Sequence, residues 1–405
     1  MKIYWHSTVF GPSSYSVLTT RTVPSIAREN YDLVVGAWYG LQGAPMPWQI
    51  KDKNGADKNL IILPNAGQHP YGADTLQATY EQHKADCLIT CSDVWIFQPN
   101  VTHKTNFCPW LPIDHDPSPQ GIIEALKPAL YPMVYSKWGV DMLAKSGVKS
   151  HYVPCSAPAD VFKPGDKQAA RAALKLPPDC EFLITMVAAN KDGGDRKGFG
   201  EALQAFAQFL KTHPHAYLYL HTNWSGPVNL RAMADSLGIK DNVIMCDQYA
   251  YSFGLLNDAY MVNVYQASDV LLNPCKAEGF GLPIVEAQMC GCPVAATDFA
   301  TTDELLFAGW KLQGQPHWSA GADSWRLMVY QWSIVDALNE AYANKDNDKL
   351  RQKARNGAIR FDNQTVFNQY WRPALKEIER LVESGKIFAV NGKAKADSKK
   401  EVVLA

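Results

Sequence analysis

The sequence predicts an α/β protein built from two doubly wound domains, each with a parallel sheet covered by helices on both faces. Two observations predict this class. Short apolar runs of strand length alternate with amphipathic helical segments along most of the 405 residues, and this alternation occurs in two separate stacks. Between the stacks, residues 153–168 carry three prolines, a glycine and several small residues, which is the composition of a linker.

The expected strands follow this pattern in chain order. Each is a run of apolar and aromatic residues, bounded by turn-forming or polar residues. In such sheets, ligands bind at the carboxyl ends of the strands. The expected strands are residues 2–5, 31–39, 59–65, 86–92, 105–113, 131–136 and 150–155 in the first stack, and 181–190, 216–222, 242–247, 269–274 and 292–297 in the second.

The stacks define the predicted domains. The N-terminal domain covers residues 1–160 and the C-terminal domain covers residues 161–363, with a hinge at about 154–168. Residues 364–383 have helical spacing that Pro373 interrupts, so we expect a kinked or split helix there. The polar, lysine-rich residues 386–405 are predicted to be disordered.

Composition narrows the function classes. Hydrophobic residues make up 47% of the chain and charged residues 20%, which predicts a globular protein with real cores. The net charge is -1, and the first 160 residues carry 12 Lys and Arg against 13 Asp and Glu, so nucleic acid as a partner is unsupported, though not excluded. No apolar run is long enough to span a membrane, and the start lacks a secretory pattern. We therefore expect a cytoplasmic protein, with peripheral membrane contact left open.

The nine cysteines are irregularly spaced and form no C-x-x-C pair. In a chain of this length, that pattern argues against a disulfide framework and against a zinc knuckle. We expect most of them to be core thiols.

The most informative segment is DVLLNPCKAEGFGLPIVEAQMCGCPVAATD, residues 269–298. A strand is followed by a glycine-containing loop and then by a helix, for which Pro283 suits the first position. Glycines let a ligand approach the backbone closely, and a helix N-terminus carries about half a positive charge, so the loop suits an anion such as a diphosphate. Glu278 and Glu286 flank this loop and suit the hydroxyl groups at the two ends of a sugar nucleotide.

The run E-G-F-G-L-P-I-V-E, followed by A-x-x-x-G-x-P-V, resembles the E-x7-E signature of the family 4 retaining glycosyltransferases, which have the two-domain GT-B fold. The resemblance implies that Glu278 contacts the donor sugar, that backbone N–H groups of the loop meet the diphosphate, and that Glu286 holds the nucleotide ribose. The donor-binding residues implied in this segment are Glu278, Gly279, Phe280, Gly281, Leu282 and Glu286.

A basic loop follows the first strand of the second stack, before an amphipathic helix. By resemblance to the same family, this loop clamps the leaving diphosphate, with Lys191 in the place of an arginine and Asn190 in the place of a glycine. A lysine keeps the charge but loses the bidentate fork of arginine. Arg196 and Lys197 complete the implied set, and Lys191 and Lys197 are expected to act catalytically.

The N-terminal domain has weaker signals. Gly11 lies where the family has a glycine-rich loop over the donor phosphates, and His115 lies in an Asp-His-Asp-Pro turn after the strand 105–113. The resemblance makes His115 the candidate that faces the reacting anomeric carbon. It also implies that the helix around Trp371 crosses back to pack on the first domain.

Asp114 and Asp116 form an Asp-x-Asp pattern, which in the other glycosyltransferase fold holds a divalent metal. Because Lys191 and Lys197 can neutralise the diphosphate, we expect neither a metal nor another cofactor. Two further segments are left open: residues 247–249, which could face the base, and the segment containing Trp310, Trp318, Trp325 and Trp332. The tryptophan segment is either an elaborated edge packed on the core or a platform for a sugar or base.

The predicted function is metal-independent, retaining transfer of a sugar from a nucleoside diphosphate to an acceptor hydroxyl. A glycan, a lipid-linked glycan, a small molecule, a protein or a modified nucleobase could be the acceptor, and UDP, GDP and ADP are not separated. The alternatives are a sugar-nucleotide epimerase, a glycoside phosphorylase, or a non-catalytic sugar-nucleotide- or glycan-binding protein. A dinucleotide-dependent oxidoreductase is disfavoured because no G-x-G-x-x-G follows the first strand.

Overall fold

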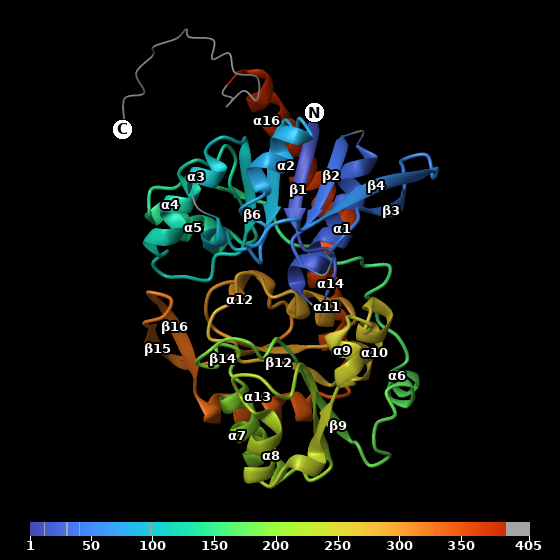
Figure 1. Cartoon of the computed structure of the whole chain (residues 1–405). Coiled ribbons are helices and arrows are strands. Elements are labelled where there is room, and N and C mark those ends of the chain that lie inside the picture. Colours follow the sequence, from blue (N-terminus) through green and yellow to red (C-terminus); the bar gives the residue numbers. More distant parts are fainter. Residues whose placement is uncertain (12, 30, 40, 98, 386–405) are drawn as a thin grey trace.

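The computed structural model describes residues 1–11, 13–29, 31–39, 41–97 and 99–385. The chain forms two large sheets, one above the other in Figure 1, with helices on both faces of each. The predicted α/β class with two doubly wound, Rossmann-like halves is confirmed. The domain boundaries given above remain a prediction, as does motion at the hinge, and the expected disordered tail lies outside the described residues.

The first sheet has the strand order β3-β4-β2-β1-β5-β6-β7-β8. All neighbours pair in parallel except β3 and β4, which form an antiparallel pair. The sequence analysis missed β3, because its apolar residues are interrupted by a proline and polar side chains. The strands are β1 (Lys2–Ser7), β2 (Asp32–Ala37), β3 (Met46–Lys51), β4 (Asp57–Pro64), β5 (Cys87–Cys91), β6 (Phe107–Leu111), β7 (Met133–Val134) and β8 (His151–Tyr152).

The helices of the first half connect these strands, and two of them begin at serine caps. The Ser13 side chain accepts a hydrogen bond from the N–H of Ser16 at the start of α1, and Ser136 does the same for Gly139 in α5. The helices are α1 (Ser14–Arg28), α2 (Leu76–Gln82), η1 (Val94–Ile96), α3 (Pro99–Thr102), α4 (Gln120–Leu126) and α5 (Lys137–Lys145).

The second sheet is entirely parallel, in the order β11-β10-β9-β12-β13-β14. Its strands β12 and β13 are buried at every position, as expected for strands covered on both faces. The strands are β9 (Phe182–Val187), β10 (Ala216–His221), β11 (Val243–Met245), β12 (Val270–Asn273), β13 (Val294–Thr297) and β14 (Gly309–Leu312).

The helices of the second half include the return to the first. They are α6 (Lys167–Ala173), α7 (Phe199–Leu210), α8 (Leu230–Ser236), η2 (Lys240–Asn242), α9 (Gln248–Ser252), α10 (Asp258–Ala267), α11 (Leu282–Met289), α12 (Thr302–Leu305), α13 (Gln331–Ala343), α14 (Asp348–Ala358), η3 (Ile359–Phe361), α15 (Asn363–Val366), η4 (Phe367–Trp371) and α16 (Arg372–Glu383).

The last helical segments run back to the first sheet (Figure 1). The Trp371 ring lies 5.8 Å from that of Trp5 and 4.8 Å from that of Trp110, in the core of the first half. Pro373 is in the first turn of α16, immediately after the π-helical turn η4, so the helical pattern is split where the proline predicted a break.

The tryptophan segment forms β14 and a separate antiparallel hairpin of β15 (Gly314–Ser319) and β16 (Ser324–Val329), which then leads into α13. Trp318 and Trp325 face each other across the hairpin and are 40% and 45% exposed, while Trp332 is 50% exposed. The interpretation as an edge packed on the core is therefore wrong for these three residues. The hairpin lies beside the junction of the two halves (Figure 1).

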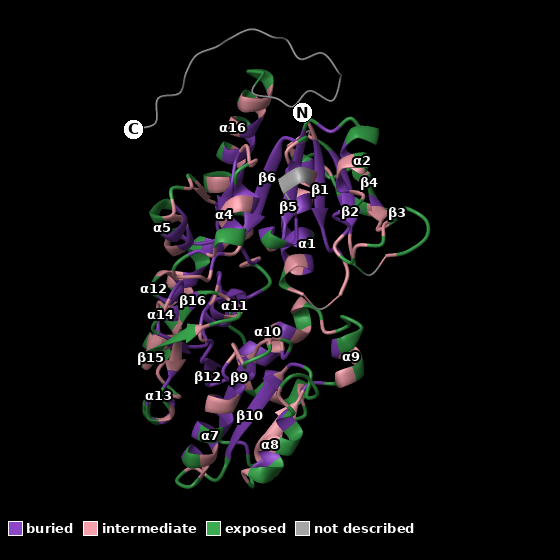
Figure 2. Cartoon of the chain, turned by 60° about the vertical axis from the view of Figure 1, so that its left-hand side comes forward, coloured by how far each residue is buried: buried purple, intermediate pink, exposed green. Residues whose placement is uncertain are grey.

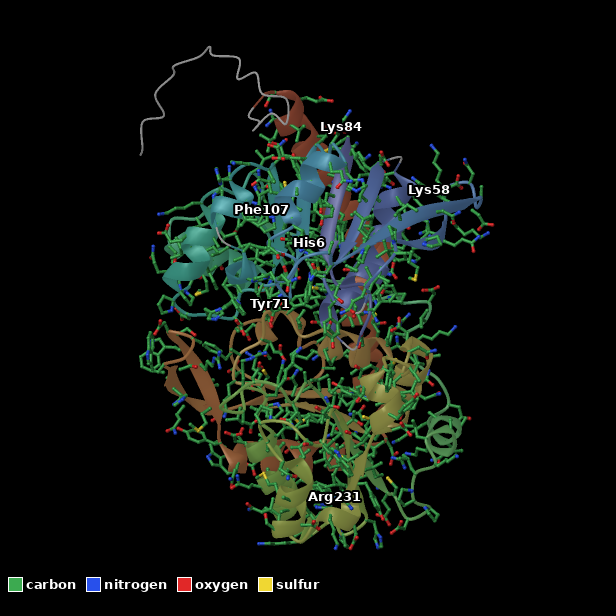
Figure 3. All side chains as sticks on the ribbon, viewed as in Figure 1. His6, Lys58, Tyr71, Lys84, Phe107 and Arg231 are labelled. Atoms are coloured by element: carbon green, nitrogen blue, oxygen red, sulfur yellow. The ribbon has the colours of Figure 1, made fainter. Side chains whose placement is uncertain are left out.

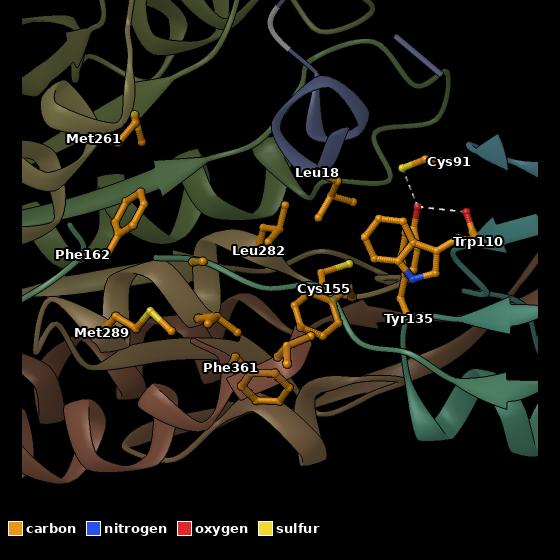
Figure 4. Packing of buried hydrophobic residues seen from close by; sticks show 14 of the residues in the cluster. Leu18, Cys91, Trp110, Tyr135, Cys155, Phe162, Met261, Leu282, Met289 and Phe361 are labelled. Carbon is orange, nitrogen blue, oxygen red and sulfur yellow. Dashed lines mark hydrogen bonds between the residues drawn. The ribbon is translucent and has the colours of Figure 1, made fainter. Parts of the chain in front are cut away.

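The buried residues form a core that continues from one half to the other. Figure 2 shows buried strands in both sheets beneath partly exposed helices. Figure 4 shows part of one cluster that joins Trp110 and Tyr135 of the first half to Leu282 and Met289 of α11. All nine cysteines are free and buried, which agrees with the expected core thiols.

Candidate functional site

The predicted site residues come from loops at the carboxyl ends of strands in both sheets. These ends face each other across the junction of the two halves (Figure 1). Contacts cross the junction directly: the Trp325 N–H donates to the carbonyl oxygen of Asp116 at 2.6 Å, and the Glu304 carboxylate accepts the N–H groups of Lys137 and Trp138 at the start of α5. The sequence thus places the candidate residues where α/β sheets bind ligands.

The glycine loop after β12 lies against the first half. A side chain at Gly279 would overlap Pro112 after β6, so this close approach requires glycine. Gly281 has φ of 107° and precedes α11, which begins at Leu282, one residue before the start predicted from Pro283. The loop therefore presents the N-terminus of α11 to the junction.

Lys197 and Glu278 form an ion pair in this loop region. The Lys197 Nζ lies 2.7 Å from Glu278 Oε1, and both side chains are largely buried. Burial opposes the charged form of Glu278, but Lys197 and Arg196 lower its pKa below the usual value. Burial also opposes the charge on Lys197, yet Cys275 and Glu278 raise its pKa. Two of the predicted catalytic residues, Lys197 and Glu278, are therefore brought together and stay charged.

Gly198 fixes the position of Lys197. Its φ of 73° lies in the left-handed region, and a side chain there would overlap the carbonyl oxygen of Pro274. The Lys276 N–H also donates to the Arg196 carbonyl oxygen at 2.8 Å. These contacts join the basic loop after β9 to the glutamate loop after β12.

Arg196 links this region to the first half. Its guanidinium donates to the Ala277 carbonyl oxygen at 2.8 Å and pairs with Asp192 at 2.8 Å and with Asp114 at 3.4 Å. His115 Nδ1 lies 2.9 Å from Asp114. Burial alone would raise the pKa of Asp114, but His115 and Arg196 hold it well below its usual range. His115 therefore lies at the junction, against the same carboxylate as Arg196.

Asn190 and Lys191 differ in their surroundings. The Asn190 side chain is buried, donates to the carbonyl oxygens of Asn223 and Val228, and accepts the Val228 N–H, so it holds the loop after β10. Its own N–H donates to the Thr222 hydroxyl. Lys191 is exposed. The structure thus gives Asn190 protein partners, and the donor-binding roles of both residues remain predictions.

Glu286 is held from both halves of the molecule. Its Oε1 lies 2.8 Å from the Arg21 guanidinium of α1, and its Oε2 accepts the Tyr265 hydroxyl at 2.8 Å. Arg21 also pairs with Asp258 at 3.1 Å and donates to the Ser156 carbonyl oxygen in the linker. Burial raises the pKa of Glu286, and Arg21 offsets this only in part.

Gly11 follows β1 with φ of 95°, and the Tyr39 ring lies against it. Nearby, the Tyr15 hydroxyl donates to Asp93 at 2.7 Å, and burial raises the pKa of Asp93. Figure 3 labels His6, whose Nε2 lies 2.8 Å from the carbonyl oxygen of Tyr71; burial lowers its pKa to about 4. His6 is therefore a neutral residue of the first half.

Sequence reasoning missed Arg21 and Arg326. Arg21 sits in an otherwise ordinary helix, and no local pattern marks it as a partner of Glu286, 265 positions further along the chain. Arg326 lies in β16, where alternation with Trp325 and Leu327 is the only local signal. Both positions depend on how the halves meet.

The described residues show neither a metal-binding cluster nor a membrane-spanning helix. No group of three or more His, Cys, Asp or Glu side chains there is placed to hold a metal ion. Within the same residues, no helix combines the length and apolar character that crossing a bilayer requires.

Comparison with known families covers the core of this site. Residues 167–309 match the family model described as glycosyl transferases group 1, and this segment contains the loops of Lys197 and Glu278. D-inositol 3-phosphate glycosyltransferase of Segniliparus rotundus is 35% identical over 152 residues, which is 36% of this chain and 31% of that protein. The matched region thus spans about a third of that relative's length.

Solved structures match over nearly the whole chain. Sucrose-phosphate synthase from Thermosynechococcus elongatus has a TM-score of 0.69 at 16% identity and covers 95% of this chain and 98% of its own. HepE from Anabaena, in complex with UDP-glucose, has a TM-score of 0.66 at 15% identity and covers 95% and 100%. Together with the two Rossmann-like halves, these similarities define the fold as that of the GT-B glycosyltransferases.

Proposed function

We propose that this protein is a glycosyltransferase that uses a nucleoside-diphosphate sugar, retains the anomeric configuration and needs no metal. The observation that carries the proposal is the Lys197–Glu278 pair beside the N-terminus of α11, on the segment that matches the group 1 glycosyl transferases. A cation, a carboxylate and a helix N-terminus at one point suit a leaving diphosphate next to a sugar hydroxyl.

The positive groups of the site stabilise the leaving phosphate, and the carboxylate of Glu278 orients the sugar. Negative charge develops on the leaving phosphate during transfer, and Lys197 together with the backbone of Gly279, Phe280, Gly281 and Leu282 stabilises it. Glu278 orients the transferred sugar by accepting hydrogen bonds from its hydroxyl groups. Lys191 is exposed, so its charge is screened by water and contributes less than that of Lys197.

Glu286 binds the ribose of the nucleotide. A carboxylate has about four lone-pair positions, so Glu286 can accept ribose hydroxyls while Arg21 and Tyr265 hold its orientation. Gly11 and His115 approach the donor from the first half, where His115 faces the reacting carbon. Proton transfer from the acceptor hydroxyl goes to a donor phosphate oxygen, which leaves no nucleophilic role for a protein carboxylate.

The acceptor is proposed from the relatives. The name of the Segniliparus rotundus relative refers to D-inositol 3-phosphate, so a phosphorylated polyol is the first acceptor to test, followed by glycans and lipid-linked glycans.

Calorimetric titration of UDP, GDP and ADP in the presence of EDTA tests the donor site. We expect one nucleotide to bind the wild type and to bind Lys197→Met at least about tenfold more weakly. Transfer from the matching nucleotide sugar, with the anomer of the product determined by NMR, then tests retention. Absence of binding for all three nucleotides, or an inverted product, would contradict the proposal.

A further inference from the structure

The hairpin of β15 and β16 holds an arginine against the candidate site. β16 is anchored along its outer edge at two points: the Trp325 N–H donates to the Asp116 carbonyl oxygen at 2.6 Å, and the Leu327 N–H donates to the Lys276 carbonyl oxygen at 2.9 Å. Arg326 lies between these anchors. It is therefore fixed between the His115 turn of the first half and the Glu278 loop of the second.

Among the residues that the structure describes, Arg326 has no ion-pair partner, in contrast to Arg196 and Lys197. Its Nε atom is buried and has no hydrogen-bond partner in the part of the chain that the structure describes. The carboxylate with the strongest attraction for it, Asp114, already pairs with Arg196 and lies against His115. Lys197 and Arg196, the nearby cations of the basic loop, are paired, Lys197 with Glu278 and Arg196 with Asp192.

A buried donor without a partner costs free energy, and a guanidinium is the side chain best suited to a phosphate. Burial and the neighbouring Arg196 both lower the pKa of Arg326, which shows that its charge is poorly compensated. An anion at this point would satisfy the side chain and relieve its repulsion with Arg196.

We propose that Arg326 binds a phosphate oxygen of the substrates at the junction, so that the hairpin is part of the substrate site. The inference rests on the proposed function for the identity of those substrates. Two sources carry the same chemistry: the diphosphate of the donor and a phosphate on the acceptor.

Calorimetry separates the two sources. UDP, GDP and ADP are titrated into wild type, Arg326→Met and Arg326→Lys, and inorganic phosphate is then titrated into each protein saturated with the nucleotide that binds. If Arg326 meets the donor, Arg326→Met weakens binding of the nucleoside diphosphate by about 10- to 100-fold. If it meets the acceptor, nucleotide binding is unchanged and phosphate binding to the loaded protein is lost.

Control variants distinguish failure of this inference from failure of the proposed function. Arg380→Met removes the same charge from the exposed face of α16, and it should change neither titration. Arg326→Lys keeps the charge without the fork and should recover part of the binding. Unchanged nucleotide and phosphate binding in Arg326→Met would overturn the inference while leaving the proposed function intact. Phosphate binding that depends on Arg326, in a protein that binds no nucleotide, would support the inference and contradict the proposed function.

Discussion

Glu286 is buried and Glu278 largely so, but the two have opposite electrostatic surroundings. Glu278 faces Lys197 and Arg196, and its pKa is lowered. Glu286 faces Arg21, which it shares with Asp258, and its pKa is raised by burial. The surroundings of Glu278 thus favour negative charge, whereas those of Glu286 do not fully offset its desolvation.

The difference assigns separate tasks to the two glutamates. All charged partners of Glu278 named above lie in its own half of the molecule, so the ion pair can rearrange around a ligand without separating the halves. Glu286 is tied to α1 of the first half through Arg21, which also contacts the linker at Ser156. Glu278 therefore belongs to an anion site. Glu286 also belongs to the joint between the halves, by which we mean Arg21 and its partners Glu286, Asp258 and Ser156.

The largest effect is expected from breaking the joint. Arg21→Met leaves Glu286 buried without its cation, so the free energy of unfolding in urea should fall by about 3–5 kcal/mol. Arg21→Met combined with Glu286→Gln removes both charges and should recover most of this loss. A fall of less than about 1 kcal/mol in the single variant would show that Arg21 does not stabilise the joint.

A comparable effect, on transfer rather than on stability, is expected at the other glutamate. Lys197→Met removes the cation beside the leaving phosphate and should lower kcat/KM by about 100- to 1000-fold. Adding Glu278→Gln removes the carboxylate that has lost its cation, but it should not restore transfer, because the developing charge still lacks its cation. Recovery of transfer in this double variant would assign the pair a structural role only.

Sequence alone predicted the local features of the site. The parallel strands other than β14, the glycine loop and the loop of Lys197 are each encoded within about 30 residues, where apolar periodicity and glycine positions are informative. The resemblance to the glycosyltransferase family implied that Lys197 and Glu278 share one site, and the structure supplies the reason: both come after strands that are neighbours in the sheet, β9 and β12.

Features that depend on contacts between the two halves could not be predicted from local sequence patterns. Arg21 and Arg326 reach their positions through contacts between segments far apart in the chain, and neither lies in a motif. The hairpin was missed for a related reason. Gly314 and Pro316 weaken its strand pattern, and in the sequence its exposed tryptophans cannot be distinguished from those of a buried edge strand. Whether a tryptophan is buried or exposed is decided by the folded chain and not by the local sequence.

A smaller effect is expected at the glycine that positions Lys197. Gly198→Ala places a side chain at φ of 73° and against the Pro274 carbonyl oxygen, so the free energy of unfolding should fall by at least about 1–2 kcal/mol. Gly193→Ala in the same loop is the matched control, because its added carbon meets no atom within 4 Å, and it should change stability by less than about 0.5 kcal/mol. Equal effects of the two variants would contradict a requirement for glycine at 198.

The smallest effect, and the most direct comparison of the two glutamates, is the pH dependence of stability. The pKa of Glu278 is lowered in the folded chain, so its ionisation stabilises the fold above the unfolded pKa of about 4.3, and this contribution is lost as pH falls through the folded pKa. The pKa of Glu286 is raised, so its contribution is fully present below about pH 4.3 and is lost as pH rises through the folded pKa.

Urea unfolding of Glu278→Gln, Glu286→Gln and wild type across acidic pH measures both contributions as differences from the wild type. The destabilisation caused by Glu278→Gln should grow with rising pH, in a window below about 4.3, whereas that caused by Glu286→Gln should shrink with rising pH, in a window above it. Slopes of the same sign would mean that the two carboxylates share one electrostatic environment, and the separation of an anion site from a joint would then fail.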